Sequence, residues 1–181
     1  MSLVDILLIG VGLSMDAAAV SIANGLTYRN LTLKQKLSMP LAFGFFQALM
    51  PLLGYWAGSL FADVISRYAG ITAFIILGII GGKMVKDSFE QEDGTCRVGG
   101  FTLGILLAQA VATSIDAFAV GVSFCASGVE IWSAAPVIGI VTFCCSLLAQ
   151  YLGKIFGARL GCRAQLAGGV ILILIGLKNL L

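Results

Sequence analysis

Long apolar stretches separated by short polar connections make up most of this chain. A helix that crosses a hydrocarbon core of about 30 Å needs about 20 consecutive apolar residues. Six stretches approach that length: Leu3–Ala23, Leu37–Phe61, Ala69–Met84, Gly100–Ala126, Ile131–Leu152 and Ala164–Leu181. The third and sixth are the shortest of them. The pattern predicts an all-α membrane protein with six transmembrane helices.

The chain also repeats itself. The segment LSMDAAAV at 13–20 returns 100 positions later as TSIDAFAV at 113–120, and a Gly-x-x-x-Gly spacing at 54 and 58 returns at 153 and 157. Each half therefore predicts three helices in the same order. Three is an odd number, so the second half should cross the membrane in the opposite sense, as in many secondary transporters. We predict two inverted three-helix repeats at 3–87 and 100–181, joined by a cytoplasmic linker at 88–99.

Composition supports a membrane location, and charge sets the orientation. Of 181 residues, 59% are hydrophobic and 11% charged, which excludes an ordinary soluble domain. The balance of 11 basic and 9 acidic residues gives no reason to expect a nucleic-acid partner. The first apolar stretch has no basic residue before it, so we expect it to be retained as a helix.

Most basic residues fall on one side of the predicted bundle. Nine lie in or near three connections: Arg29, Lys34, Lys36, Lys83, Lys86, Arg97, Lys154, Arg159 and Arg163. Only Arg67 and Lys178 fall on the other side. Because cytoplasmic loops carry an excess of Lys and Arg, we expect these connections in the cytoplasm and both termini outside.

The repeated motif places one acid in each of two apolar helices, Asp16 and Asp116. An Asp at the bilayer centre costs roughly 2.5–3.5 kcal/mol on insertion scales, so an intramembrane acid suggests a functional site. Two facing carboxylates repel each other unless one takes a proton or a cation lies between them. A structural hydrogen-bonded pair and a metal-free proton relay both stay open as alternatives.

The available ligands determine which cation would suit such a site. The chain has no histidine, and its five cysteines form no C-x-x-C pair, so we predict that the thiols are bystanders. An all-oxygen site suits Mg²⁺, Ca²⁺ or Mn²⁺. Besides the two acids, the candidate ligands are Ser14, Asn24, Gln47, Gln109, Thr113 and Ser114.

Helical periodicity assigns faces to these residues. Gln109, Thr113, Asp116, Ser123 and Ser127 form a polar stripe that we expect to face the protein interior. Ser14, Ala18, Ser21 and Gly25 form a separate stripe of small residues, which predicts a close-packing seam. Ser14 is therefore a weaker ligand candidate than its place in the motif suggests, unless the helix is unwound there.

The duplicated motif, with the segments at 43–54 (FGFFQALMPLLG) and 168–176 (GGVILILIG), resembles the bacterial manganese efflux pump family (MntP), which is related to the lysine exporters. The resemblance implies a secondary transporter that exports Mn²⁺ across the inner membrane. It implies that Mn²⁺ is the substrate, with no cofactor, and that Asp16 and Asp116 match the family's essential acids. Position 47 is Glu in some members and Gln here.

Several alternatives stay open beside this one. The substrate could be Cd²⁺, Mg²⁺ or an amino acid, and a sporulation-associated branch shares the same repeat. An intramembrane aspartyl protease also places two acids on separate helices, although the chain lacks the Gly-x-Gly-Asp pattern that such enzymes resemble. We expect no enzyme activity. The sequence contains no phosphate-binding loop for ATP, and it leaves open the coupling ion, a proton or another, and a homo-oligomer.

Overall fold

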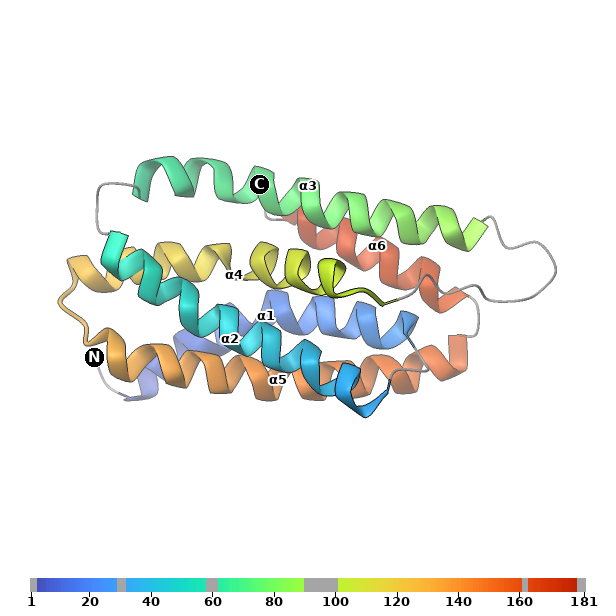
Figure 1. Ribbon diagram of the computed structural model, residues 1–181, viewed down its shortest axis with the longest axis horizontal. Helices are drawn as coiled ribbons and strands as arrows, with labels where there is room; N and C mark the ends of the chain where they lie inside the picture. Colours follow the sequence, from blue (N-terminus) through green and yellow to red (C-terminus); the bar gives the residue numbers. More distant parts are fainter. Residues whose placement is uncertain (1–2, 29–31, 58–61, 90–100, 161–162, 179–181) are drawn as a thin grey trace.

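The computed structural model describes residues 3–28, 32–57, 62–89, 101–160 and 163–178, which form six α-helices and no strand (Figure 1). The helices are α1 (Leu3–Thr27), α2 (Leu33–Ala57), α3 (Ala62–Phe89), α4 (Leu103–Ala126), α5 (Ile131–Leu160) and α6 (Arg163–Lys178). The predicted all-α fold is confirmed for this part of the chain. The predicted linker at 88–99 lies outside the described residues from position 90 onward, and so do Arg29, Arg97 and Gly58.

Four of the described helices are long and apolar enough to cross a membrane: α1, α2, α4 and α5. A shorter apolar helical segment, Leu166–Ile175, lies within α6. Large apolar side chains project outward from the bundle, among them Phe45, Trp56, Ile79 and Trp132. Outward-facing apolar side chains are what contact with lipid requires, so the chain is a membrane protein.

Several predicted helix boundaries are wrong, most of them by about one turn or more. The structure has α2 beginning at Leu33 rather than at 37, because Thr32 and Gln35 cap the helix reciprocally. The backbone amide of Gln35 donates to Thr32 Oγ1 at 3.4 Å, and the backbone amide of Thr32 donates to Gln35 Oε1 at 3.0 Å. In α4, Thr102 accepts from the Ile105 amide, so the helix begins at 103 and not at 100. The third helix spans 28 residues against the 16 predicted, because its polar ends continue the helix beyond the apolar stretch.

The helices pack in pairs. α1 packs chiefly on α5, α2 packs on both α4 and α5, and α3 packs on α6. Within the first pair the helices run parallel, since Gly10 lies beside Ile138 near the start of both and Gly25 lies beside Gln150 further along. Figure 1 shows the same parallel direction for α2 and α4, whereas α3 and α6 run antiparallel. Segments far apart in the sequence therefore lie side by side.

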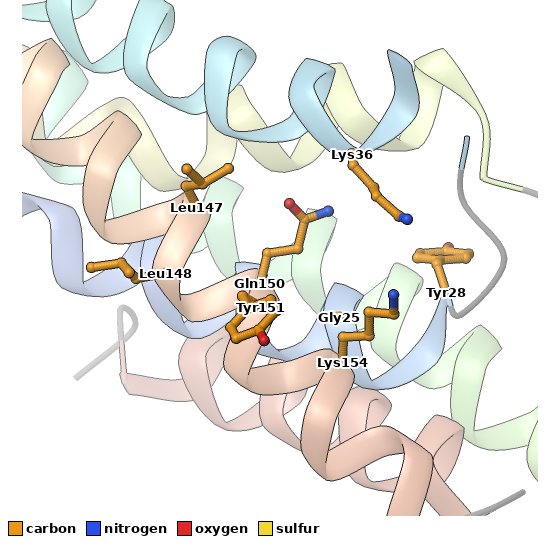
Figure 2. Close-up of a pocket in the computed structure, with 8 residues that line it drawn as sticks. All are labelled: Gly25, Tyr28, Lys36, Leu147, Leu148, Gln150, Tyr151 and Lys154. Atoms are coloured by element: carbon orange, nitrogen blue, oxygen red, sulfur yellow. The ribbon is translucent and has the colours of Figure 1, made fainter. Parts of the chain in front are cut away.

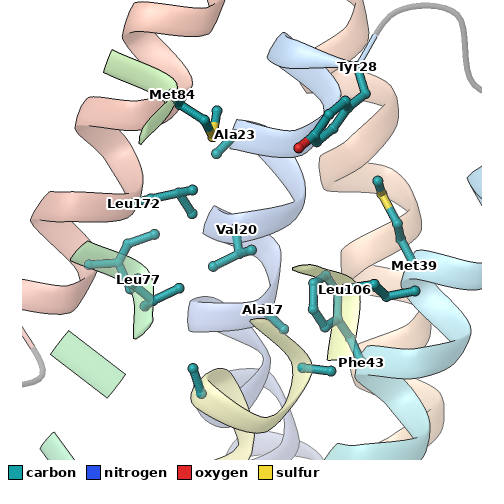
Figure 3. Packing of buried hydrophobic residues seen from close by; sticks show 13 residues of the cluster. Ala17, Val20, Ala23, Tyr28, Met39, Phe43, Leu77, Met84, Leu106 and Leu172 are labelled. Carbon is teal, nitrogen blue, oxygen red and sulfur yellow. The ribbon is translucent and has the colours of Figure 1, made fainter. Parts of the chain in front are cut away.

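One apolar cluster surrounds the middle of α1, where Ala17, Val20 and Ala23 are fully buried (Figure 3). Leu77 from α3 and Leu172 from α6 pack against this part of α1 and are equally buried. A second cluster joins the other half of α1 to α4 and α5. α1 therefore occupies the centre of the bundle, and this position holds its acid between several helices.

Glycines allow the paired helices to approach closely. A Cβ added at Gly25 would overlap the carbonyl oxygen of Gln150, and one added at Gly153 would overlap that of Ile22. The small-residue seam predicted on the first helix is thus confirmed at Gly25, and its partner is α5. The α2–α4 pair has the same construction, with Gly54 against the Phe118 carbonyl and Gly121 against the Pro51 carbonyl.

Candidate functional site

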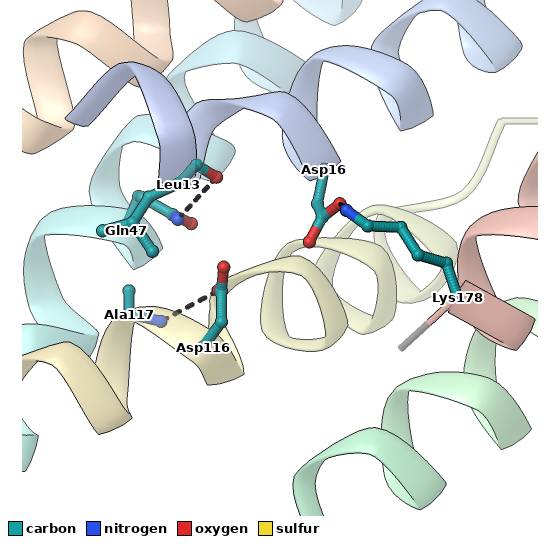
Figure 4. Close-up of polar contacts among 6 residues, drawn as sticks. All are labelled: Leu13, Asp16, Gln47, Asp116, Ala117 and Lys178. Atoms are coloured by element: carbon teal, nitrogen blue, oxygen red, sulfur yellow. Dashed lines mark hydrogen bonds and ion pairs between the residues drawn. The ribbon is translucent and has the colours of Figure 1, made fainter. Parts of the chain in front are cut away.

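The two motif acids lie on continuous helices and face each other. Both α1 and α4 remain helical through Asp16 and Asp116. Figure 4 shows the two carboxylates pointing toward one another, Asp16 from α1 and Asp116 from α4. The Asp16 side chain is 14% exposed, whereas Asp116 is in the more exposed position.

A cation from a third helix already contacts one of these acids. Lys178 Nζ, at the last turn of α6, donates to Asp16 Oδ1 at 3.0 Å. The lysine side chain is 69% exposed, so it reaches the acid from the open side of the site. Asp116 forms no ion pair with the residues that the structure describes, and its Oδ1 accepts from the Ala117 backbone amide at 2.8 Å. The two carboxylates are therefore held in different ways.

Gln47 is the predicted ligand that lies beside the acids. Its side chain is fully buried on α2, and Nε2 donates to the Leu13 carbonyl oxygen at 3.1 Å (Figure 4). Its other polar atom, Oε1, has no hydrogen-bond partner in the described part of the chain. A buried acceptor without a partner costs about 1–3 kcal/mol. This oxygen is thus a neutral acceptor available to a cation or a water molecule near the acids.

Asn24 and Gln109 form a separate polar layer. The two amides pair reciprocally, with Asn24 Nδ2 to Gln109 Oε1 at 2.8 Å and Gln109 Nε2 to Asn24 Oδ1 at 3.2 Å, and both side chains are fully buried. Asn24 lies eight residues after Asp16, which is about 12 Å along the helix axis. The structure brings these two predicted ligands together but not next to the acids. Their amides tie α1 to α4.

The three predicted hydroxyl ligands bond to their own helices. Ser14 donates to the Val11 carbonyl at 2.8 Å, Thr113 donates to that of Gln109 at 3.0 Å, and Ser114 donates to that of Ala110 at 2.7 Å. Such back-bonding uses the hydroxyl proton and leaves the oxygen lone pairs available. All three side chains are buried. Their role as ligands stays a prediction.

The interior polar stripe predicted on the fourth helix holds only along half its length. Gln109 and Thr113 are buried, but Ser123 and Ser127 are exposed. The prediction is wrong for the last two turns, where these two serine side chains lie on the outer surface of the described bundle. The acids therefore lie where a buried polar layer meets a more open end of the bundle.

Sequence reasoning missed Lys178 as a member of the site. The sequence places Lys178 on the side with few basic residues and at the end of an apolar helix, in a Gly-x-Lys pattern that also occurs at Gly81–Lys83. Neither feature predicts that it contacts an acid. Buried hydroxyls without partners were also missed, those of Ser21, Thr142 and Ser146 on the paired helices α1 and α5. Of these three, only Ser21 lies in a sequence feature that predicted burial, the small-residue seam.

The described residues contain no group of three or more His, Cys, Asp or Glu side chains that could hold a metal ion. Any cation bound here must therefore use the two carboxylates with amide, hydroxyl, carbonyl or water oxygens. Facing carboxylates on membrane-spanning helices are typical of α-helical membrane proteins that transport ions.

Comparison with known proteins gives the family. The family model described as "Putative manganese efflux pump" matches residues 30–180. Proteins named "Putative manganese efflux pump MntP" are similar over nearly the whole chain. One from Ruminiclostridium cellulolyticum is 49% identical, and the match covers 98% of this chain and 95% of the relative. One from Actinobacillus succinogenes is 46% identical, and the match covers 100% of this chain and 97% of the relative. A third, from Bifidobacterium adolescentis, is 47% identical over 98% and 95%. No solved structure matches.

The chain belongs to the manganese efflux pump family. The family is one of transporters and not of enzymes, which excludes the intramembrane protease considered above. In such a family, manganese is cargo and not a resident cofactor.

Proposed function

We propose that this protein exports Mn²⁺ from the cytoplasm across the bacterial plasma membrane, and that Asp16 and Asp116 form the cation site near the middle of the bilayer. The observation that carries the proposal is the facing position of these two carboxylates (Figure 4). Membership in the family supports manganese as the cargo. Two negative charges would balance one divalent cation, and hard oxygen ligands suit Mn²⁺.

The remaining ligands would be neutral oxygens. Gln47 Oε1 is the first candidate, because it is buried near the acids without a partner. Ser14, Thr113 and Ser114 would contribute through oxygen lone pairs, since their protons are already donated. Asn24 and Gln109 would release their mutual hydrogen bonds only if the cation passed their layer on its way to the acids. Water would complete the coordination.

We further propose that six helices cross the membrane as two inverted repeats, 3–87 and 100–181. The helix pairs support this arrangement, because a twofold exchange of α1 with α4 and of α2 with α5 converts the α1–α5 contact into the α4–α2 contact. The same exchange relates Gly153 against α1 to Gly54 against α4. Both termini would lie outside, with the basic connections in the cytoplasm. One repeat would rock against the other to expose the site alternately.

The metal content of cells tests the export proposal. A strain that lacks this protein should accumulate manganese when grown in excess Mn²⁺, and expression of the protein should restore the normal level. Mass spectrometry of several metals in the same cells gives the control, because magnesium and cadmium should not change. Accumulation of cadmium or magnesium instead, or of no metal at all, would contradict Mn²⁺ as the substrate.

Lys178 would act as a tethered counter-cation in this cycle. Its ammonium group neutralises Asp16 at 3.0 Å in the present state, so an arriving Mn²⁺ must displace it. The mostly exposed lysine can move away from the site. When Mn²⁺ leaves, the lysine returns and spares the empty protein an unpaired intramembrane charge. In this role, Lys178 would neutralise Asp16 in the empty state, so the protein could return to its starting conformation without a second bound metal ion.

Substitution of this lysine tests the competition. Lys178→Met should bind Mn²⁺ about fivefold more tightly, because a partly exposed ion pair contributes about 1 kcal/mol or less. Its transport rate should nevertheless fall, since the empty site keeps an unpaired charge. Lys178→Arg keeps the cation and is the matched control. Titration of purified protein with Mn²⁺ measures the affinity, and equal affinities in the Met and Arg variants would contradict the proposal.

A further inference from the structure

A second feature of the molecule lies away from the acids. A cavity of about 390 Å³ opens among the C-terminal end of α1, the first turn of α2 and the second half of α5 (Figure 2). Its lining includes Tyr28, Lys36, Gln150 and Lys154. The export cycle described above assigns no task to this cavity.

Two ammonium groups from different helices line the same cavity. Lys36 comes from α2 and Lys154 from α5, and Figure 2 shows both side chains directed toward the region of Tyr28. Among the described residues, neither lysine side chain takes part in an ion pair or a hydrogen bond. Tyr28 and Gln150 also line the cavity and are buried, at 8% and 7% exposure. Two cations without counter-charges in one concavity favour an anionic ligand.

The opposite wall of the cavity is apolar and continues onto the outer surface of α5. Leu148 and Tyr151 line the cavity and are each 64% exposed, and Leu147 beside them is 38% exposed. Large exposed apolar side chains on a membrane-spanning helix lie against lipid chains. The cavity therefore has a cationic side and an apolar side that opens toward the bilayer.

The position along the helices matches the level of lipid headgroups. The cavity lies where α1 ends and α2 begins. Lysine and tyrosine side chains typically lie at this interface. Basic pockets between transmembrane helices at this level bind the headgroups of anionic lipids.

We propose that this cavity binds one anionic phospholipid. Lys36 and Lys154 would pair with the headgroup phosphate, and an acyl chain would lie along Leu148 and Tyr151 on α5. The apolar wall favours a lipid over a soluble anion, because a free phosphate would gain nothing from it. The proposal concerns a lipid site and does not depend on which metal the protein transports.

Lipid titration of the purified full chain tests this site. Phosphatidylglycerol is added to protein held in phosphatidylcholine nanodiscs, and bound lipid is counted by native mass spectrometry. In the variant Lys36→Gln/Lys154→Gln, the dissociation constant for phosphatidylglycerol should rise about 30-fold, from about 1 kcal/mol for each lysine. Lys34→Gln is the matched control, because Lys34 is also in the first turn of α2 but does not line the cavity. It should leave the constant unchanged.

Three results of the lipid titration would overturn the proposal. Equal affinity of the wild type and the double variant would show that the lysines do not hold the lipid. Equal binding of glycerol phosphate and phosphatidylglycerol would indicate a soluble-anion site, and equal binding of phosphatidylcholine would indicate a nonspecific apolar groove. If the double variant does not fold, the single variants decide the question, each with an expected rise of about fivefold.

Discussion

Asp16→Asn and Asp116→Asn should each abolish manganese export while leaving the protein inserted in the membrane. Asparagine keeps the size of the side chain and its carbonyl oxygen but removes the negative charge that balances a divalent cation. Loss of a group that only supports a metal ligand costs 10–100-fold in affinity, so loss of a charged ligand should cost at least about 100-fold. Growth of an exporter-deficient strain in excess Mn²⁺, with Mn²⁺ flux into inverted membrane vesicles, measures the effect.

Two controls separate loss of the site from general damage. Glu130→Gln removes an acid from an exposed position just before α5 and should export normally. Asp16→Asn also deprives Lys178 of its partner, so Asp16→Asn/Lys178→Met should remain as inactive as the single variant. If either Asp variant supported full manganese tolerance, the assignment of the acids as the cation site would be wrong.

The helices themselves could be predicted from the sequence, because apolar stretches of nearly 20 residues leave few other structures possible in lipid. Their ends could not. The apolar residues mark only the segment of each helix that lies in the hydrocarbon core. Polar turns and caps, such as Thr32 with Gln35, extend the helix beyond that segment. The same limit explains why the third helix, with Ala62 and Phe89 at its ends, was predicted too short.

The candidate site was predictable as far as the repeat reached. Duplication identified Asp16 and Asp116, and the structure has them facing each other. The repeat does not say how the two helices are placed along one another. The pairing of Asn24 with Gln109 in a separate layer therefore could not be predicted from the spacing of the residues. The contact of Lys178 with Asp16 joins residues 162 positions apart, and only the packing of α6 on α1 determines it.

The seam between α1 and α5 should be highly sensitive to one added methyl group. A Cβ at Gly25 would overlap the backbone oxygen of Gln150, and a helix backbone cannot move aside as a flexible side chain can. Hydrophobic burial does not hold helices together in lipid; close packing does, so a forced separation removes the main source of stability at this contact. Gly25→Ala should therefore destabilise the fold by about 2–3 kcal/mol, the upper part of the range for overpacking.

Gly12→Ala is the matched control, since it makes the same change on the same helix. A Cβ at Gly12 would meet no atom within 4 Å, so alanine there should stabilise α1 by up to about 1 kcal/mol through helix propensity. Thermal unfolding of both variants in detergent should therefore move in opposite directions. Equal stability would mean that α1 and α5 lie farther apart than the structure has them. The seam would then not fix the position of α1, and the position of Asp16 relative to Asp116 would need another explanation.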